Sequence, residues 1–114
     1  MPNHISHVEI IGTDAPRLQT FYADLFDWKV NADNPFNYGI FDASDAGIGG
    51  GIGDDMGGGK RVTVYVGVYD LQAYLDKAES LGGTTVMPPT EIMDGVTIAL
   101  FTDPDGNVTG LTQN

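Results

Sequence analysis

The chain has 114 residues, of which 41% are hydrophobic and 18% are charged, and it contains no cysteine. A chain of this length is typical of one domain, which can fold without disulfides or a structural metal. Five basic against sixteen acidic residues give a formal charge of −11, which would repel a nucleic-acid backbone. No membrane-length apolar run or signal-like segment is present, so we expect no nucleic-acid or membrane partner and a cytoplasmic location.

The first predicted elements are a strand and an amphipathic helix. Residues 5–11 are rich in β-branched side chains and end at Gly12, as a strand would. Asp14 can cap a helix that has Pro16 in its first turn. The apolar residues of this helix recur at the spacing of one face, which predicts that they pack in the core: Leu18, Phe21, Tyr22, Leu25 and Phe26.

Three further strands are predicted in the first half, followed by a linker. The strands are Trp28 to Ala32, Asn37 to Phe41 and Ile48 to Ile52. Residues 54–60 are rich in glycine, which suits a flexible connection. The glycine spacing from Gly47 to Gly59 matches neither of the common nucleotide-binding motifs, so we interpret this segment as a linker.

The second half repeats the order of the first. A strand over 61–68 places valines 62, 64, 66 and 68 on one face, which should pack on the helices. Asp70 can cap the next helix, and Gly82 with Gly83 can end it. The remaining predicted strands are Thr84 to Met87, Val96 to Thr102 and Val108 to Thr112, with a loop from Pro88 to Gly95.

The two halves are related by an internal repeat. Asp14 and Asp70 lie 56 residues apart, whereas Phe41 and Phe101 lie 60 apart, so the second half carries extra residues. We therefore predict an α+β fold of two βαβββ modules, with module one at 1–53, the linker at 54–60 and module two at 61–114. One helix cannot cover both faces of its own sheet, so the two sheets should enclose a shared cavity.

Several short motifs occur in an order found in a known superfamily. The first half has His7-Val8-Glu9-Ile10 and later Phe21-Tyr22, and the second half ends its motifs with Phe101-Thr102-Asp103-Pro104-Asp105-Gly106-Asn107. This ordered set resembles the vicinal oxygen chelate superfamily, which contains glyoxalases, bleomycin-resistance proteins and extradiol dioxygenases. The resemblance covers nearly the whole chain and implies the paired-module fold.

The resemblance also implies where a catalytic metal would bind. In the metal enzymes of the superfamily, each module supplies a histidine from its first strand and a glutamate from its last. Those positions fall on His7, Gly50, Thr63 and Gly110 here, so three of the four ligands are missing. Because a catalytic zinc usually has three protein ligands, we expect no metal cofactor. A weakly bound divalent metal, with Glu9 beside His7, is the alternative.

Strand alternation selects the residues that should face the shared cavity. Glu9 has the parity of His7, and Tyr65 has the parity of Thr63, so these four are the candidate ligand-binding residues. Glycines 50, 67 and 110 should leave space for a small ligand. His7 and Glu9 are also the candidate catalytic residues, although a lone histidine is more often structural than catalytic and Glu9 would act as a base only if burial raises its pKa.

Three functions remain open at this stage. The first is binding of a small molecule in the cavity between the modules, without the catalytic metal, as a protein similar to the glyoxalases and bleomycin-resistance proteins. The second is a divalent-metal-dependent lyase or dioxygenase of the same superfamily, and the third is a non-enzymatic domain that binds a protein partner. Whether the chain is an enzyme is left open. Proteins of this size in the superfamily commonly pair, so a homodimer is expected.

Overall fold

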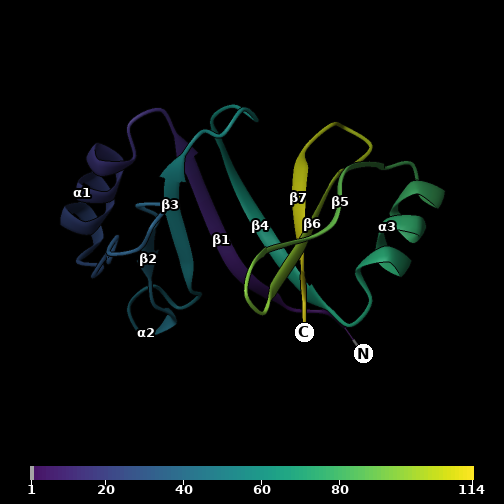
Figure 1. Cartoon of the computed structure of the whole chain (residues 1–114), viewed down its shortest axis with the longest axis horizontal. Coiled ribbons are helices and arrows are strands. Elements are labelled where there is room, and N and C mark those ends of the chain that lie inside the picture. The colour runs from purple at the N-terminus through teal and green to yellow at the C-terminus, as the bar shows by residue number, and fades with distance from the viewer. Residues whose placement is uncertain (1) are drawn as a thin grey trace. The chain divides into compact units, whose positions relative to one another are not determined.

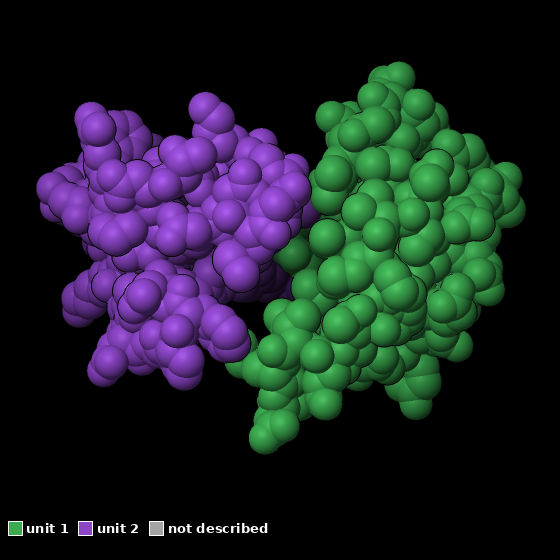
Figure 2. All heavy atoms as spheres, turned by 45° about the horizontal axis from the view of Figure 1, so that its top comes forward, with its two compact units in different colours: residues 1–5, 64–114 green, residues 6–63 purple. Residues whose placement is uncertain are grey.

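The computed structural model describes residues 2–114 and contains, within that range, three helices and seven strands. The fold is α+β, as predicted. The chain forms two compact units, coloured separately in Figure 2: Ser6–Thr63, and Val64–Asn114 together with the N-terminal residues up to Ile5. Between residues 2 and 114, every helix is too short or too polar to cross a bilayer.

The unit Ser6–Thr63 is built on three strands and one long helix (Figure 1). Strand β1 (Ile5–Gly12) runs parallel to β3 (Gly50–Asp54), and β2 (Gly39–Phe41) pairs antiparallel with β3. Helix α1 (Ala15–Phe26) follows β1, and the short α2 (Ala43–Ala46) follows β2. The core consists of Ile10, Phe41 and Ile52, with the Trp28 ring stacked on Phe41 at a centroid distance of 4.6 Å.

Helix α1 begins where the sequence predicts, but only part of its predicted apolar face packs in the core, namely Leu18 and Tyr22. The Asp14 carboxylate accepts a hydrogen bond from the Arg17 amide at 3.3 Å, so the cap is confirmed. The buried residues are Ala15 and Gln19, whereas Phe21, Leu25 and Phe26 are 52–57% exposed. The predicted apolar face is therefore wrong for these three residues.

Gln19 explains this orientation of α1. Its Nε2 donates to the backbone carbonyls of Asn37 at 2.9 Å and Ile52 at 2.8 Å. A buried amide that satisfies two carbonyls stabilises the rotation of the helix that turns Gln19 inward. The two exposed phenylalanines instead contact aromatic neighbours: the ring centroids of Phe21 and Tyr22, and those of Phe26 and Trp28, lie 5.2 Å apart.

Two of the strands predicted in the first half are shorter in the structure, and the strand predicted from Ile48 to Ile52 is shifted to Gly50–Asp54. The run from Trp28 to Ala32 contributes a single bridge, between Asn31 and Ile40, and β2 begins at Gly39 instead of Asn37. Asn34 accounts for the late start, because its side chain accepts from the Tyr38 amide at 3.0 Å and donates to the Tyr38 carbonyl at 2.7 Å. These bonds use backbone groups that a strand partner would otherwise occupy.

The second unit has the predicted order of one helix and four strands. Strand β4 (Arg61–Val68) pairs in parallel with β7 (Val108–Gln113), and β6 (Val96–Thr102) lies antiparallel between β7 and β5 (Thr84–Met93). Helix α3 (Leu71–Ser80) begins at the Asp70 cap. The core cluster lies between the helix and the sheet: Val68, Leu71, Leu75, Ala99 and Leu111.

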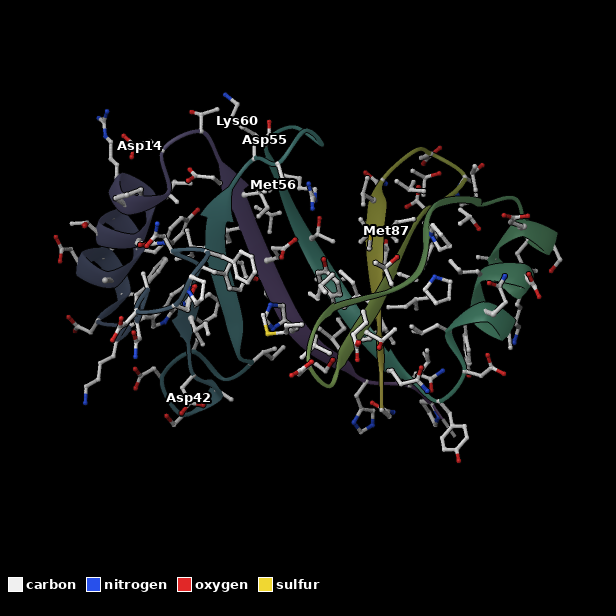
Figure 3. All side chains as sticks on the ribbon, viewed as in Figure 1. Asp14, Asp42, Asp55, Met56, Lys60 and Met87 are labelled. Atoms are coloured by element: carbon white, nitrogen blue, oxygen red, sulfur yellow. The ribbon has the colours of Figure 1, made fainter. Side chains whose placement is uncertain are left out.

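The prediction of a loop from Pro88 to Gly95 is wrong. Strand β5, on which Met87 lies (Figure 3), continues through the prolines to Met93. The turn is confined to Asp94 and Gly95, where Gly95 has a φ of +78°. Register shifts between β5 and β6 accommodate the irregular strand. The extra residues of the second half therefore extend a hairpin.

The valines of β4 do not form one buried face. Val68 is fully buried and Val66 packs beside it on the α3 cluster, but Val62 and Val64 are 68% and 36% exposed. The packing of all four valines on the helices is therefore a wrong prediction, because the α3 cluster extends only to the C-terminal half of the strand.

The glycine-rich linker is ordered around Asp55, which Figure 3 shows with Met56 and Lys60 beyond the end of β3. The Asp55 carboxylate accepts from the amides of Gly57 at 2.7 Å and Gly59 at 2.8 Å, and these bonds lower the Asp55 pKa below 3.8. Gly57 and Gly59 have φ values of +116° and +86°. Glycine is required at both positions, since other residues adopt such φ angles only with strain.

Candidate ligand-binding site on strand β1

A polar cluster lies on β1 of the unit Ser6–Thr63. His7 Nε2 lies 2.9 Å from the Tyr38 hydroxyl, and that hydroxyl donates to Glu9 Oε2 at 3.0 Å. All three side chains are half-buried. His7 and Glu9 thus point to the same side of β1, as predicted, and Tyr38 bridges them through its hydroxyl.

The hydrogen bonds determine the protonation of the cluster. A carboxylate has no proton to donate, so the single Tyr38 proton points at Glu9 and the phenolic oxygen must accept from His7. His7 therefore carries its proton on Nε2. Burial lowers the pKa of His7 below its ordinary value of 6.5, against the opposing charge of Glu9, so the imidazole is neutral at neutral pH.

Arg61, the first residue of β4, completes the cluster. Its guanidinium donates to Glu9 Oε1 at 3.2 Å, and the two side chains are only 22% and 14% exposed. Each carboxylate oxygen of Glu9 therefore accepts a bond, one from Tyr38 and one from Arg61. The Arg61 Nε atom is buried and has no hydrogen-bond partner among residues 2–114.

Two glycines of β3 provide the space that the Tyr38 ring occupies. A Cβ built on Gly51 would overlap the Tyr38 ring and hydroxyl, and one on Gly53 would lie 2.9 Å from the ring. Gly51 is also the residue paired with Glu9 across β1 and β3. Glycine at both positions leaves the space next to the strand free for the Tyr38 ring.

This register corrects one position inferred from the superfamily. The first-module glutamate position was placed at Gly50, but a Cβ on Gly50 would meet the Val8 carbonyl and the Phe41 ring in the core. Gly51 is the neighbour whose side chain would point toward His7 and Glu9. The count between modules is one residue off because the connection from β2 to β3, which contains α2, is one residue longer than the connection from β6 to β7: Phe41 pairs with Gly50, whereas Phe101 pairs with Thr109.

The second unit also has a tyrosine ring packed on a glycine of its last strand, β7. Gly110 of β7 pairs with Tyr65 of β4, and a Cβ on Gly110 would overlap the Tyr65 ring. Tyr65 is 4% exposed. In each unit, a tyrosine ring therefore covers the glycine that stands where the superfamily has a metal-binding glutamate.

The residues at the four metal positions do not fit a catalytic metal. A glutamate at Gly51 or Gly110 would need the space that Tyr38 or Tyr65 fills. Thr63, at the second histidine position, is 1% exposed, and its hydroxyl has no hydrogen-bond partner within residues 2–114. No group of three or more His, Cys, Asp or Glu side chains in that range is placed to hold a metal. His7 carries its proton on Nε2 and donates it to Tyr38, so this nitrogen has no lone pair for a metal.

The buried Thr63 hydroxyl leads to a testable expectation. Replacing a buried, unbonded hydroxyl by a methyl group of the same shape removes a desolvation penalty, so Thr63→Val should raise the free energy of unfolding by about 1 kcal/mol. Urea denaturation would measure this change. Thr84→Val, on the exposed side of β5, is the matched control and should change stability by less than about 0.5 kcal/mol. A destabilised Thr63→Val variant would show that the hydroxyl has a partner after all.

The expected cavity lined by His7, Glu9, Thr63 and Tyr65 stays a prediction. The structure brings His7 and Glu9 together in one cluster. Thr63 belongs to the same compact unit, whereas Tyr65 belongs to the other. Two cavities in the structure, one beside α3 and one beside α1, are lined by other residues.

Sequence reasoning missed Tyr38 and Arg61. Tyr38 lies in a segment predicted as strand, where an aromatic residue looks structural, and Arg61 looks like the solvated start of the next strand. One signal was available in Gly51 and Gly53, because small residues at every second position indicate the close approach of another group. That signal does not say which group approaches.

The chain belongs to the Glyoxalase/Bleomycin resistance protein/Dioxygenase superfamily, whose sequence pattern matches residues 4–111. It is 31% identical to the CFP32 proteins of Mycobacterium tuberculosis and Mycobacterium bovis, whose names describe them provisionally as glyoxylases. The match includes 93% of this chain but only 44% of those relatives, so the chain spans less than half of their length.

Solved structures share the fold at low sequence identity. A hypothetical protein of Bacillus halodurans has a TM-score of 0.74 at 13% identity, covering 100% of this chain and 96% of its own. Methylmalonyl-CoA epimerase of Mycobacterium tuberculosis has a TM-score of 0.69 at 16% identity, covering 96% and 86%. A superfamily member of Vibrio splendidus has 0.67 at 16%, covering 99% and 100%. These likenesses establish the fold alone.

Proposed function

We propose that this protein binds a small molecule at the β1 face that carries His7, Glu9 and Tyr38, without the catalytic metal of its superfamily. The observation that carries the proposal is the Tyr38 hydroxyl, which bonds to both His7 and Glu9. A phenol in this place supplies a fixed polar group where the metal enzymes have a cation and its carboxylate ligand. Thr63, which belongs to the same unit, is a proposed lining residue of this face, and the role of Tyr65 stays a prediction from the sequence.

The chemistry of the cluster restricts what it can recognise. Glu9 and Arg61 neutralise each other, and His7 is neutral, so the cluster has no net charge. Its directional groups are an imidazole, a phenol and one edge of a guanidinium. Such a set suits a polar, partly apolar ligand that both donates and accepts hydrogen bonds. The superfamily of the chain is described by glyoxalases and bleomycin-resistance proteins, so lactoylglutathione and bleomycin are suitable probes of binding.

Metal independence is the first expected result. Protein purified without chelators should retain substoichiometric Zn, Ni, Mn and Fe by elemental analysis, and its unfolding transition should not move when EDTA is added. The reason is that three of the four ligand positions lack a side chain that binds a metal tightly. His7→Ala serves as the control for the remaining ligand.

A stoichiometric metal that EDTA removes and that His7→Ala depletes would contradict the proposal. It would favour the divalent-metal-dependent lyase or dioxygenase instead. Formation of lactoylglutathione from methylglyoxal and glutathione, abolished by EDTA and restored by metal, would lead to the same conclusion.

Ligand binding is tested by following the NMR resonances of the His7 imidazole. In the presence of EDTA, bleomycin or lactoylglutathione is titrated while the His7 ring resonances are followed by NMR. A ligand at the β1 face should shift the His7 resonances and leave those of the exposed His4 unchanged. Equal shifts at both histidines, or none at either, would count against binding at this face. The homodimer and the cytoplasmic location remain predictions from the sequence.

A further inference from the structure

A cavity lies within the unit that contains Val64–Asn114, and none of its lining residues belongs to the polar cluster on β1. It has a volume of about 340 Å³ and lies between helix α3 and strands β4, β6 and β7. Its walls are apolar and include Val66, Val68, Phe101 and Leu111. The volume is in the range of small-molecule sites, and such sites combine apolar walls with a few polar groups.

Lys77 supplies the charge at this cavity. It is the one Lys or Arg between Val64 and Asn114, a segment that also contains seven Asp and Glu residues. It lines the cavity from the last turn of α3 and forms no ion pair with any residue of 2–114. The acidic residues of this segment repel an anion, so Lys77 is the charged group at the cavity that would attract an anionic ligand.

Two further polar groups line the cavity. The Tyr74 hydroxyl accepts from Asn3 Nδ2 at 2.9 Å, which leaves its own proton available to a ligand. Asp103 also lines the cavity and would oppose an anion. Its oxygens accept bonds within its own turn, from the amides of Asp105 and Asn107 and from the Asn107 side chain, each at 2.9 Å. These bonds lower the pKa of Asp103 and keep it negatively charged, so an anionic ligand must bind on the Lys77 and Tyr74 side of the cavity.

We propose that the cavity beside α3 binds a small carboxylate with an apolar body, such as a medium-chain fatty acid anion. The apolar body lies against Val66, Phe101 and Leu111, and the carboxylate is bound by Lys77 and the Tyr74 hydroxyl. None of these residues belongs to the cluster on β1, so this site stands or falls independently of the proposed function.

Octanoate is the probe, and octanol is its uncharged comparator. Titration followed by the methyl resonances of Val68 and Leu111 should show that octanoate binds more tightly than octanol. Lys77→Met keeps the apolar stem and removes the charge, so it should weaken octanoate binding roughly two- to five-fold and leave octanol binding unchanged. Lys60→Met, which removes a cation from the linker, is the matched control and should bind octanoate as the wild type does.

Filling the cavity provides the second variant. Ala78→Trp should weaken the binding of both probes by about tenfold or more, and circular dichroism would verify that the variant is folded. If it does not fold, Val66→Phe takes its place. The proposal is overturned if octanoate does not bind, if octanol binds as well as octanoate, if Lys77→Met and Lys60→Met behave alike, or if the filled cavity binds octanoate normally. Shifts of the His7 resonances in the same titration would also contradict it.

Discussion

Gly50→Ala is expected to lower the free energy of unfolding by about 3 kcal/mol or more, which is enough to prevent folding of a marginally stable domain. The added Cβ would meet the backbone carbonyl of Val8 and the buried Phe41 ring. A carbonyl in a strand pair cannot move without breaking the parallel pairing of β1 with β3. Urea denaturation of the purified variant would measure the loss.

The neighbouring glycine supplies the control. A Cβ on Gly49 would lie 3.6 Å from the Phe41 carbonyl oxygen and 3.7 Å from the Ala43 amide nitrogen, which is ordinary contact. Gly49→Ala should therefore change stability by less than about 1 kcal/mol. Equal stabilities for the two variants would mean that β3 does not hold the register described for it.

Glu9→Gln is expected to destabilise the protein by roughly 2 kcal/mol. Glu9 accepts one bond from Tyr38 and one from Arg61, and its side chain is 14% exposed. The amide preserves the shape but leaves the Arg61 guanidinium without its carboxylate in a mostly buried place. Glu91→Gln, on an exposed stretch of β5, is the matched control and should lie within about 0.5 kcal/mol of the wild type.

The same substitution should move the titration of His7. Burial lowers the pKa of His7, and the Glu9 charge opposes that shift. Without the charge, the folded-state pKa should fall further, and NMR titration of the His7 ring would detect the change. A pKa that stays in place would mean that Glu9 does not act on the imidazole.

The sign of the pH effect on stability follows from the lowered pKa of His7. As the pH falls below 6.5, the unfolded chain binds a proton that the folded protein does not, so the wild type loses stability until the folded-state pKa is reached. Glu9→Gln should extend this loss to lower pH. His7→Gln should remove this part of the pH dependence, and His4→Gln should not.

Most of the fold could be predicted from the sequence because it depends on local patterns. The structure confirms the two helix caps, Asp14 and Asp70, and the strands over 61–68 and 96–102. The candidate site was predicted in part. His7 and Glu9 follow from strand alternation, but Tyr38 and Arg61 come from segments 29 and 52 residues from Glu9 in the sequence.

The sequence by itself determined the superfamily, the α+β class and the absence of three metal-ligand side chains. The first two follow from ordered motifs and local periodicity, and the third follows from which residue types stand at the ligand positions. Only the tertiary structure decided which face of α1 is buried, since that depends on two carbonyls that Gln19 meets from distant segments. It also decided that Gly51, instead of Gly50, lies beneath Tyr38. Register between strands is fixed by packing and by irregular turns, and a shift of one residue turns a side chain from the core to the site.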